Sequence, residues 1–273
     1  MNNPPTCRTK GTYSLRTDAL LTLYDKKRKK KQTAEYEEDL GSPITAITAL
    51  IGEDLLLGLF DHYLQDKTAG DGIVWDPNSM YKCKGSENSG PRLDAWVETK
   101  KGKLYQVEAK NWCASAIGGV EVDDDRETNA EKTKSKRKAY TWPEAAKHNR
   151  ERYLKHKDAI RPVWKVLVKT EIPDKFSDKK PERLLLFWSP VAPFEDAPKD
   201  KLEPLFSVKT AEFAESIKKT GLDLPVPYAE EVYIFSASNY LRQTGAPSEL
   251  QIRMPRVRGR LEELRKLGFE IKL

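Results

Sequence analysis

Three ionisable residues, Asp94, Glu108 and Lys110, interrupt two apolar runs within the segment GPRLDAWVETKKGKLYQVEAKNW at 90–112. A plain strand would carry valine or isoleucine at such positions. Two carboxylates and an amine are groups that can hold a divalent cation and act on a water molecule. The chemistry that they suggest is hydrolysis, provided that the fold brings them to one face.

The turn between the two runs fixes how they pair. Lys-Lys-Gly at 100–102 suits a three-residue hairpin loop whose last residue is left-handed, a conformation that glycine tolerates. Such a loop pairs Thr99 with Lys103. The same register then sets Asp94 directly opposite Glu108.

Side chains alternate between the two faces of a strand, so Lys110 is expected on the same face as Glu108. Gln106 is expected there too, as a substrate contact or, alternatively, as a solvent-facing strand residue. The other face of the hairpin would be apolar and would carry Leu93, Ala95, Val97, Tyr105, Val107 and Ala109.

Directly opposed carboxylates are destabilising, because their Cβ atoms lie roughly 4.5–5.5 Å apart. A hard cation such as Mg²⁺ would relieve this, since it keeps several waters and needs only one or two protein carboxylates plus substrate phosphate. Lys110 could orient or deprotonate the attacking water, or stabilise charge as a phosphodiester is cleaved. In the alternative interpretation, Asp94 and Lys110 form an ordinary cross-strand ion pair and Glu108 faces solvent.

Positive charge is unevenly distributed, although the formal net charge is only +6. Three blocks stand out, at 26–31, 126–157 and 253–266, and such blocks favour a polyanionic partner. Solvated helix faces and a flexible arm are the alternative. The candidate nucleic-acid contacts are Gln106, Lys134, Arg137, Lys138, Arg256 and Arg258.

Composition narrows the class of protein. No apolar run approaches the roughly 20 residues of a membrane span, and the first ten residues do not resemble a signal peptide. The three cysteines form no CxxC pair and there are only three histidines, which argues against structural zinc. We expect a reduced, cytoplasmic protein that is not bound to a membrane.

Patterning predicts an α/β protein with a mixed central β-sheet flanked by helices. Residues 1–41 form an N-terminal extension, basic and partly helical, and 42–273 form the main domain with a basic C-terminal helix. The expected elements are a helix from Pro43 to about Gln65, strands at 92–98 and 104–112, helices within 126–158, strands at 163–172 and 183–190, loops around a short helix at 209–219, a strand and helix within 230–244, and a helix at 257–268.

On these residues the chain resembles the PD-(D/E)xK nuclease superfamily, which has the restriction-endonuclease-like fold. Asp94 in GPRLDAWV and Glu108-Ala109-Lys110 in LYQVEAKNW match the acid and the (D/E)xK of the motif. The resemblance implies that Asp94, Glu108 and the carbonyl of Ala109 ligate Mg²⁺, with Mn²⁺ as a substitute, and that Lys110 is the catalytic lysine. Pro91 departs from the pattern, because it lies three residues before the acid instead of directly before it.

Many members of the superfamily also carry an acid on the helix before the hairpin. On a helical wheel, Glu53 falls within the apolar stripe, whereas Asp54 and Asp61 lie toward an edge. A buried lone carboxylate is costly unless it is paired or coordinated. Glu53 is therefore expected to join the site, unless it meets a lysine or arginine or the helix phase differs.

The leading hypothesis is a metal-dependent DNA endonuclease acting in defence, mobile-element or repair processes. Cutting both strands of double-stranded DNA with one site per subunit would favour a symmetric homodimer. An RNA- or tRNA-directed nuclease and a non-catalytic nucleic-acid-binding module on the same fold are the alternatives. An adaptor for an acidic protein is a further one.

Overall fold

The structure, a computed structural model, describes residues 11–22, 43–68, 70–75, 94–110, 120–121, 172–188, 190–192, 202–211, 229–245 and 248–268. Of 43–50, 74–75, 110, 120–121 and 191–192 it describes the backbone alone. Its helices and strands are β1 (Thr12–Arg16), α2 (Pro43–Lys67), β2 (Ile73–Trp75), β3 (Ala95–Thr99), β4 (Leu104–Lys110), β5 (Val120–Glu121), the 3-10 helix η4 (Asp174–Phe176), β6 (Glu182–Phe187), β7 (Val191–Ala192), β8 (Leu205–Lys209), β9 (Glu231–Ser236), α6 (Ala237–Gln243), β10 (Glu249–Arg253) and α7 (Pro255–Lys266).

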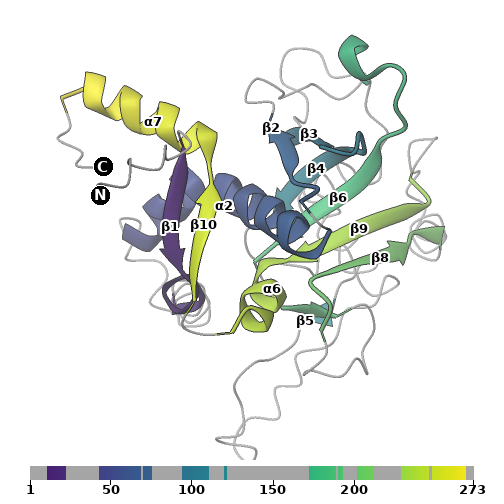
Figure 1. Ribbon diagram of the computed structural model, residues 1–273, viewed down its shortest axis with the longest axis horizontal. Coiled ribbons are helices and arrows are strands. Elements are labelled where there is room, and N and C mark those ends of the chain that lie inside the picture. Colours follow the sequence, from purple (N-terminus) through teal and green to yellow (C-terminus); the bar gives the residue numbers. More distant parts are fainter. Residues whose placement is uncertain are drawn as a thin grey trace, which may run out of the picture.

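A six-stranded mixed sheet with strand order β2-β3-β4-β6-β9-β8 forms the centre of the molecule (Figure 1). Strands β2, β3 and β4 are antiparallel neighbours, β4, β6 and β9 are parallel, and β8 returns antiparallel to β9. Helices α2 and α6 pack against β6. The predicted α/β class, with a mixed central sheet and flanking helices, is confirmed.

The β3–β4 hairpin has the register that its turn sequence predicts. Ala95 pairs with Val107, and the backbone N–H of Thr99 donates to the carbonyl of Lys103 at 2.7 Å. Gly102 ends the loop with a φ of 85°, in the left-handed region that favours glycine. A local signal was sufficient here, because the loop length and its glycine determine which residues face each other.

Both faces of this hairpin are buried. One face enters the main hydrophobic core with the residues predicted for it, namely Ala95, Val97, Tyr105, Val107 and Ala109. The other carries Trp96 and Leu104, which cluster with Phe176, and also Gln106 and Glu108, each only 2% exposed. The interpretations in which Gln106 or Glu108 faces solvent are therefore wrong.

Helix α2 begins at Pro43 as predicted, and its middle is surrounded by protein. It lies between the β1–β10 pair and the six-stranded sheet (Figure 1), and every residue from 54 to 61 is buried. The helical-wheel prediction is wrong: Asp54 and Asp61 are completely buried, whereas Glu53 is only partly so. A helix that packs on several sides has no single apolar stripe from which a phase can be read.

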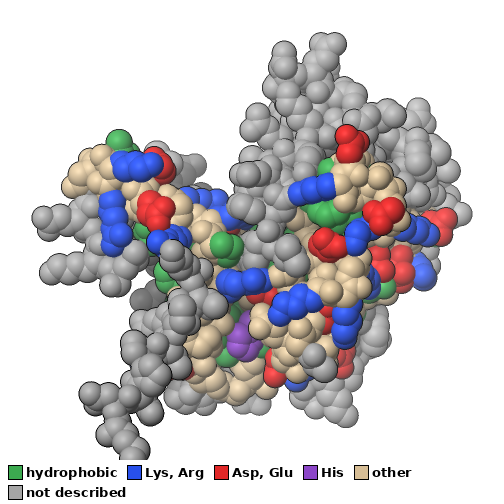
Figure 2. All heavy atoms as spheres, turned by 45° about the horizontal axis from the view of Figure 1, so that its top comes forward, with side chains coloured by type: hydrophobic (Ala, Val, Ile, Leu, Met, Phe, Trp, Pro, Cys, Tyr) green, Lys and Arg blue, Asp and Glu red, His purple; other side chains and the backbone are tan. Residues whose placement is uncertain are grey.

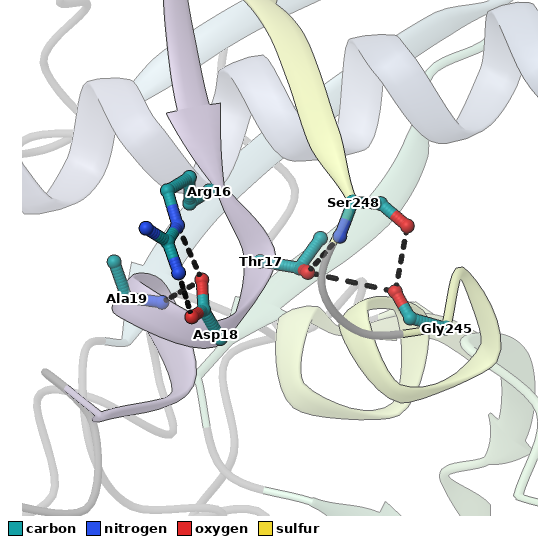
Figure 3. A network of polar contacts seen from close by, with 6 residues as sticks. All are labelled: Arg16, Thr17, Asp18, Ala19, Gly245 and Ser248. Carbon is teal, nitrogen blue, oxygen red and sulfur yellow. Dashed lines mark hydrogen bonds and ion pairs between the residues drawn. The ribbon is translucent and has the colours of Figure 1, made fainter.

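Strand β1 pairs antiparallel with β10, so residues 12–16 and 249–253 lie side by side although they are far apart in the sequence. Just beyond it, the backbone N–H of Thr17 donates to the carbonyl of Ser248 at 3.0 Å. In return, the N–H of Ser248 donates to Thr17 Oγ1 at 3.0 Å (Figure 3). The hydroxyl of Ser248 donates to the carbonyl of Gly245 at 2.7 Å. The described part of the expected extension at 1–41, which includes a helical turn at 17–22, is thus integrated with the C-terminal strand.

The remaining predictions have three outcomes. The segment 230–244 forms β9 and α6, and the last basic helix is α7, as predicted. Strands β1, β5, β7, β8 and β10 were not predicted. The expected elements at 126–158, 163–171 and most of 209–219 lie outside the described residues. Among the helices that are described, none has the length and apolar character needed to cross a membrane.

Candidate active site

Asp94 and Glu108 meet where β3 begins. Continuing the hairpin register by one position sets them opposite each other. The carboxylate of Asp94 is tied to the neighbouring strand, because its Oδ2 accepts a hydrogen bond from the backbone N–H of Ala109 at 2.7 Å. The two acids that the sequence predicts as a pair are therefore positioned by adjacent strands.

A third acid, Glu53 of α2, lies within electrostatic range of Asp94. Burial has the largest effect on Glu53 and raises its pKa, and the negative charge of Asp94 raises it further. Arg256 and Arg260 act in the opposite direction without cancelling the rise. A partly buried carboxyl beside a like charge is a group that a bound cation would stabilise.

Asp54, the neighbour of Glu53 in sequence, is held by two arginines of α7. Arg256 Nε donates to Asp54 Oδ1, and Arg260 Nη1 lies 2.7 Å from Asp54 Oδ2. Arg256 also reaches the backbone carbonyl of Asp94, with Nη1 at 3.5 Å. Its side chain is only 13% exposed, so the expectation that Arg256 lies on a nucleic-acid-binding surface is corrected: it is an internal counter-ion.

Asp61, seven residues after Asp54 on the same helix, forms a separate ion pair. Its Oδ1 accepts the backbone N–H of Ile73 at 2.7 Å, and its Oδ2 lies 3.0 Å from Arg253 Nε. Arg253 donates in turn to the carbonyl of Ile73. The sequence contained a signal for this arrangement, since a seven-residue spacing places both aspartates on one helix face, but it did not identify their partners.

These contacts join Asp54 in the middle of α2 to Arg256, Arg260 and the backbone of Asp94, with Glu53 within electrostatic range. No family model, curated protein or solved structure matches this chain. What this site can do chemically must therefore be inferred from its own residues.

Other residues predicted for the site are placed as follows. Lys110 ends β4, and only its backbone is described. Gln106 is buried on β4 beside Arg183 of β6. Arg258, on an exposed part of α7, is paired with Glu262 at 2.7 Å. Three further candidates lie outside the described residues, namely Lys134, Arg137 and Lys138.

The donor atoms at this site suit a hard divalent cation, because all of them are oxygens. Among the described residues, no group of three or more His, Cys, Asp or Glu side chains is close enough to hold a metal. A closed cage of the kind that holds structural zinc is therefore not formed by them. Mg²⁺ does not require one, since a pair such as Asp94 and Glu108 can hold it together with water and phosphate oxygens.

The described surface carries charges of both signs. Figure 2 shows Lys and Arg side chains interleaved with Asp and Glu over one face. A cavity of about 450 Å³ near the starts of β6 and β9 is also mixed, with Lys180, Glu182, Lys209 and Glu231 in its lining, and it contains none of the predicted site residues. The basic blocks at 26–31 and 126–157 lie outside the described residues.

Proposed function

We propose that this protein is a divalent-metal-dependent nuclease with a restriction-endonuclease-like core. The observation that carries the proposal is the hairpin register that sets Asp94 opposite Glu108, with the Asp94 carboxylate tied to the N–H of Ala109. The order of elements supports it, because α2 precedes the hairpin and β6 then runs parallel to β4.

In this proposal Asp94 and Glu108 hold Mg²⁺ or Mn²⁺, with the carbonyl of Ala109 as a further ligand. The bound ion supplies Lewis-acid activation of water and stabilises negative charge on the phosphate. Lys110 follows Glu108 by two residues on the same strand, and its role is to orient the attacking water. Glu53 adds negative charge beside Asp94 and so favours binding of the cation.

Nucleic acid is the proposed substrate because clustered lysines and arginines suit a polyanion. Arg256 and Arg258 are engaged in ion pairs, so contacts with the phosphate backbone are assigned to Lys134, Arg137 and Lys138. Double-stranded DNA is the first substrate to test, and a symmetric dimer would allow both strands to be cut.

The test uses the full chain with supercoiled plasmid, single-stranded DNA and tRNA, in Mg²⁺, Mn²⁺ or EDTA. Asp94→Asn and Glu108→Gln should each lower the cleavage rate at least about 100-fold. The matched control is Glu98→Gln, four residues after Asp94 and on the same face of the hairpin but paired with Lys179. That variant should cleave within about twofold of wild type, as expected for a surface substitution away from the site.

The outcomes separate the candidate functions. Cleavage of tRNA alone would identify the RNA-directed nuclease. Salt-sensitive binding that ignores EDTA and Glu108→Gln, with no cleavage, would identify a non-catalytic binding module. Undiminished cutting by both Asp94→Asn and Glu108→Gln would remove the proposed site.

A further inference from the structure

Arg256 connects the C-terminal arm, β10 and α7, to the start of β3. It lies in the first turn of α7, immediately after Pro255. From there one guanidinium group makes two contacts, through Nε with Asp54 Oδ1 and through Nη1 with the backbone carbonyl of Asp94. These partners come from α2 and from the residue that precedes β3, more than 160 positions away along the sequence.

We propose that Arg256 is a positioning residue: it fixes the backbone at Asp94 so that the carboxylate of Asp94 is held beside Glu108. This inference rests on the proposed function. Asp94 is anchored at two points, because its carbonyl accepts from Arg256 and its Oδ2 accepts from Ala109. With both anchors in place, the residue cannot turn its carboxylate away from β4 without losing one of these hydrogen bonds.

The guanidinium group is suited to this task in a way that an ammonium group is not. Its donors form a rigid planar fork, so one donor can remain on Asp54 while another reaches a second acceptor. Arg260 holds the other oxygen of Asp54, which fixes the carboxylate on which Arg256 rests. A lysine at position 256 would keep the positive charge but would lose the bridge between Asp54 and Asp94.

A matched control is available on the same arm. Arg253 makes the same kind of contact with a fully buried aspartate of α2, and it too donates to a backbone carbonyl, that of Ile73. Its partners, Asp61 and Ile73, are not predicted ligands. Arg253→Lys therefore reports the general cost of weakening such a pair.

The first measurement is Mn²⁺ affinity without substrate, by electron paramagnetic resonance, for wild type, Arg256→Lys and Arg253→Lys. We expect Arg256→Lys to weaken Mn²⁺ binding about 10-fold or more, the scale seen for residues that orient metal ligands, and Arg253→Lys to leave it within about twofold. If the charge of Arg256 were all that mattered, Arg256→Lys would bind as wild type does. That result, or equal losses in the two variants, would overturn the proposal.

The second measurement does not depend on metal. The N–H of Ala109 donates to Asp94 Oδ2, so its hydrogen exchange reports whether Asp94 is held in place. Exchange at Ala109 should be at least about 10-fold faster in Arg256→Lys than in Arg253→Lys, and equal rates would overturn the proposal.

If Arg256→Lys does not fold, Arg260→Lys takes its place. Faster exchange at Ala109 in Arg260→Lys would then support the proposal, and unchanged exchange would overturn it. A wild type that binds no Mn²⁺ yet shows the expected exchange difference would reject the proposed function, not the positioning role.

Discussion

Asp54 and Asp61 are two aspartates on one face of α2, each completely buried and each paired with arginine from the C-terminal arm. At Asp61 the three groups are bonded to one another: one carboxylate oxygen accepts the backbone N–H of Ile73, the other accepts from Arg253, and Arg253 also donates to the carbonyl of Ile73. At Asp54 two arginines meet one carboxylate, and two further acids, Glu53 and Asp94, lie within range of Arg256.

We propose that this difference separates a structural ion pair at Asp61 from a ligand site near Asp54. Both aspartates are completely buried and paired with arginine, so neither burial nor an arginine partner is diagnostic. What distinguishes the surroundings of Asp54 is the additional acid: burial and the charge of Asp94 both raise the pKa of Glu53 even though Arg256 and Arg260 are near. In the proposed function, a hard cation would relieve this crowding of acids.

The largest effects on stability are expected from removing either buried aspartate, Asp61 or Asp54. Asp61→Ala leaves the N–H of Ile73 without its acceptor and Arg253 without its carboxylate. Because Arg253 is 36% exposed, the loss should fall at the lower end for a broken buried pair, about 3 kcal/mol of unfolding free energy. Urea unfolding measures it. The control on the same helix, Asp66→Ala, removes an exposed acid and should change stability by less than about 0.5 kcal/mol.

Asp54→Ala sharpens the contrast, because it should destabilise the fold at least as much as Asp61→Ala and should also weaken Mn²⁺ binding. Asp61→Ala should leave Mn²⁺ affinity unchanged in the folded protein. Equal effects of the two variants on Mn²⁺ affinity would show that the surroundings of Asp54 and Asp61 do not differ in function.

A smaller effect is expected between the two aspartates, at Gly58. A Cβ there would lie 2.5 Å from Ile252 Cγ2 and 2.9 Å from the carbonyl oxygen of Arg253. Overpacking typically costs 1–3 kcal/mol, against about 1 kcal/mol of helix propensity gained from alanine. We expect Gly58→Ala to lose about 1–2 kcal/mol in urea unfolding. Gly259→Ala, at a helical position with open space around it, should be neutral or stabilising. Stabilisation by both substitutions would mean that α2 does not pack tightly on β10.

The sequence predicted what depends on local geometry. The loop that ends at Gly102 determined the hairpin register, and this register set Asp94 opposite Glu108. The apolar run at 183–190 predicted a strand, and β6 is that strand, with buried residues on both of its faces. Each of these inferences needed only residues that are close together in the sequence.

Contacts between distant segments could not be predicted in this way. The arginines of the C-terminal arm were interpreted as contacts for a polyanion, because nothing in a single sequence indicates that Arg256 meets an aspartate 202 residues away. The helical wheel failed for a related reason: it assumes one buried face, and α2 is covered by β10 on one side and by the large sheet on another. Two aspartates seven residues apart in an apolar helix are a usable signal for buried partners, although not for their identity.

The smallest effect is a dependence on pH, expected next to Asp61 at His62. Its Nδ1 lies 2.6 Å from the hydroxyl of Tyr240, and burial lowers its pKa from 6.5 although Asp66 and Asp61 oppose the shift. The folded protein therefore prefers neutral His62, and as the pH falls below 6.5 the unfolded chain takes up a proton that the folded chain resists. Stability should be lost on going from pH 7.5 to 5. His62→Asn removes this contribution, so the unfolding free energy of the variant should fall less than that of wild type over the same pH interval. Loss of the hydrogen bond to Tyr240 lowers the stability of the variant equally at both pH values and does not affect this comparison. Urea unfolding at the two pH values tests this. An equal or steeper fall in the variant would mean that the negative charges of Asp61 and Asp66, and not burial, dominate the pKa of His62.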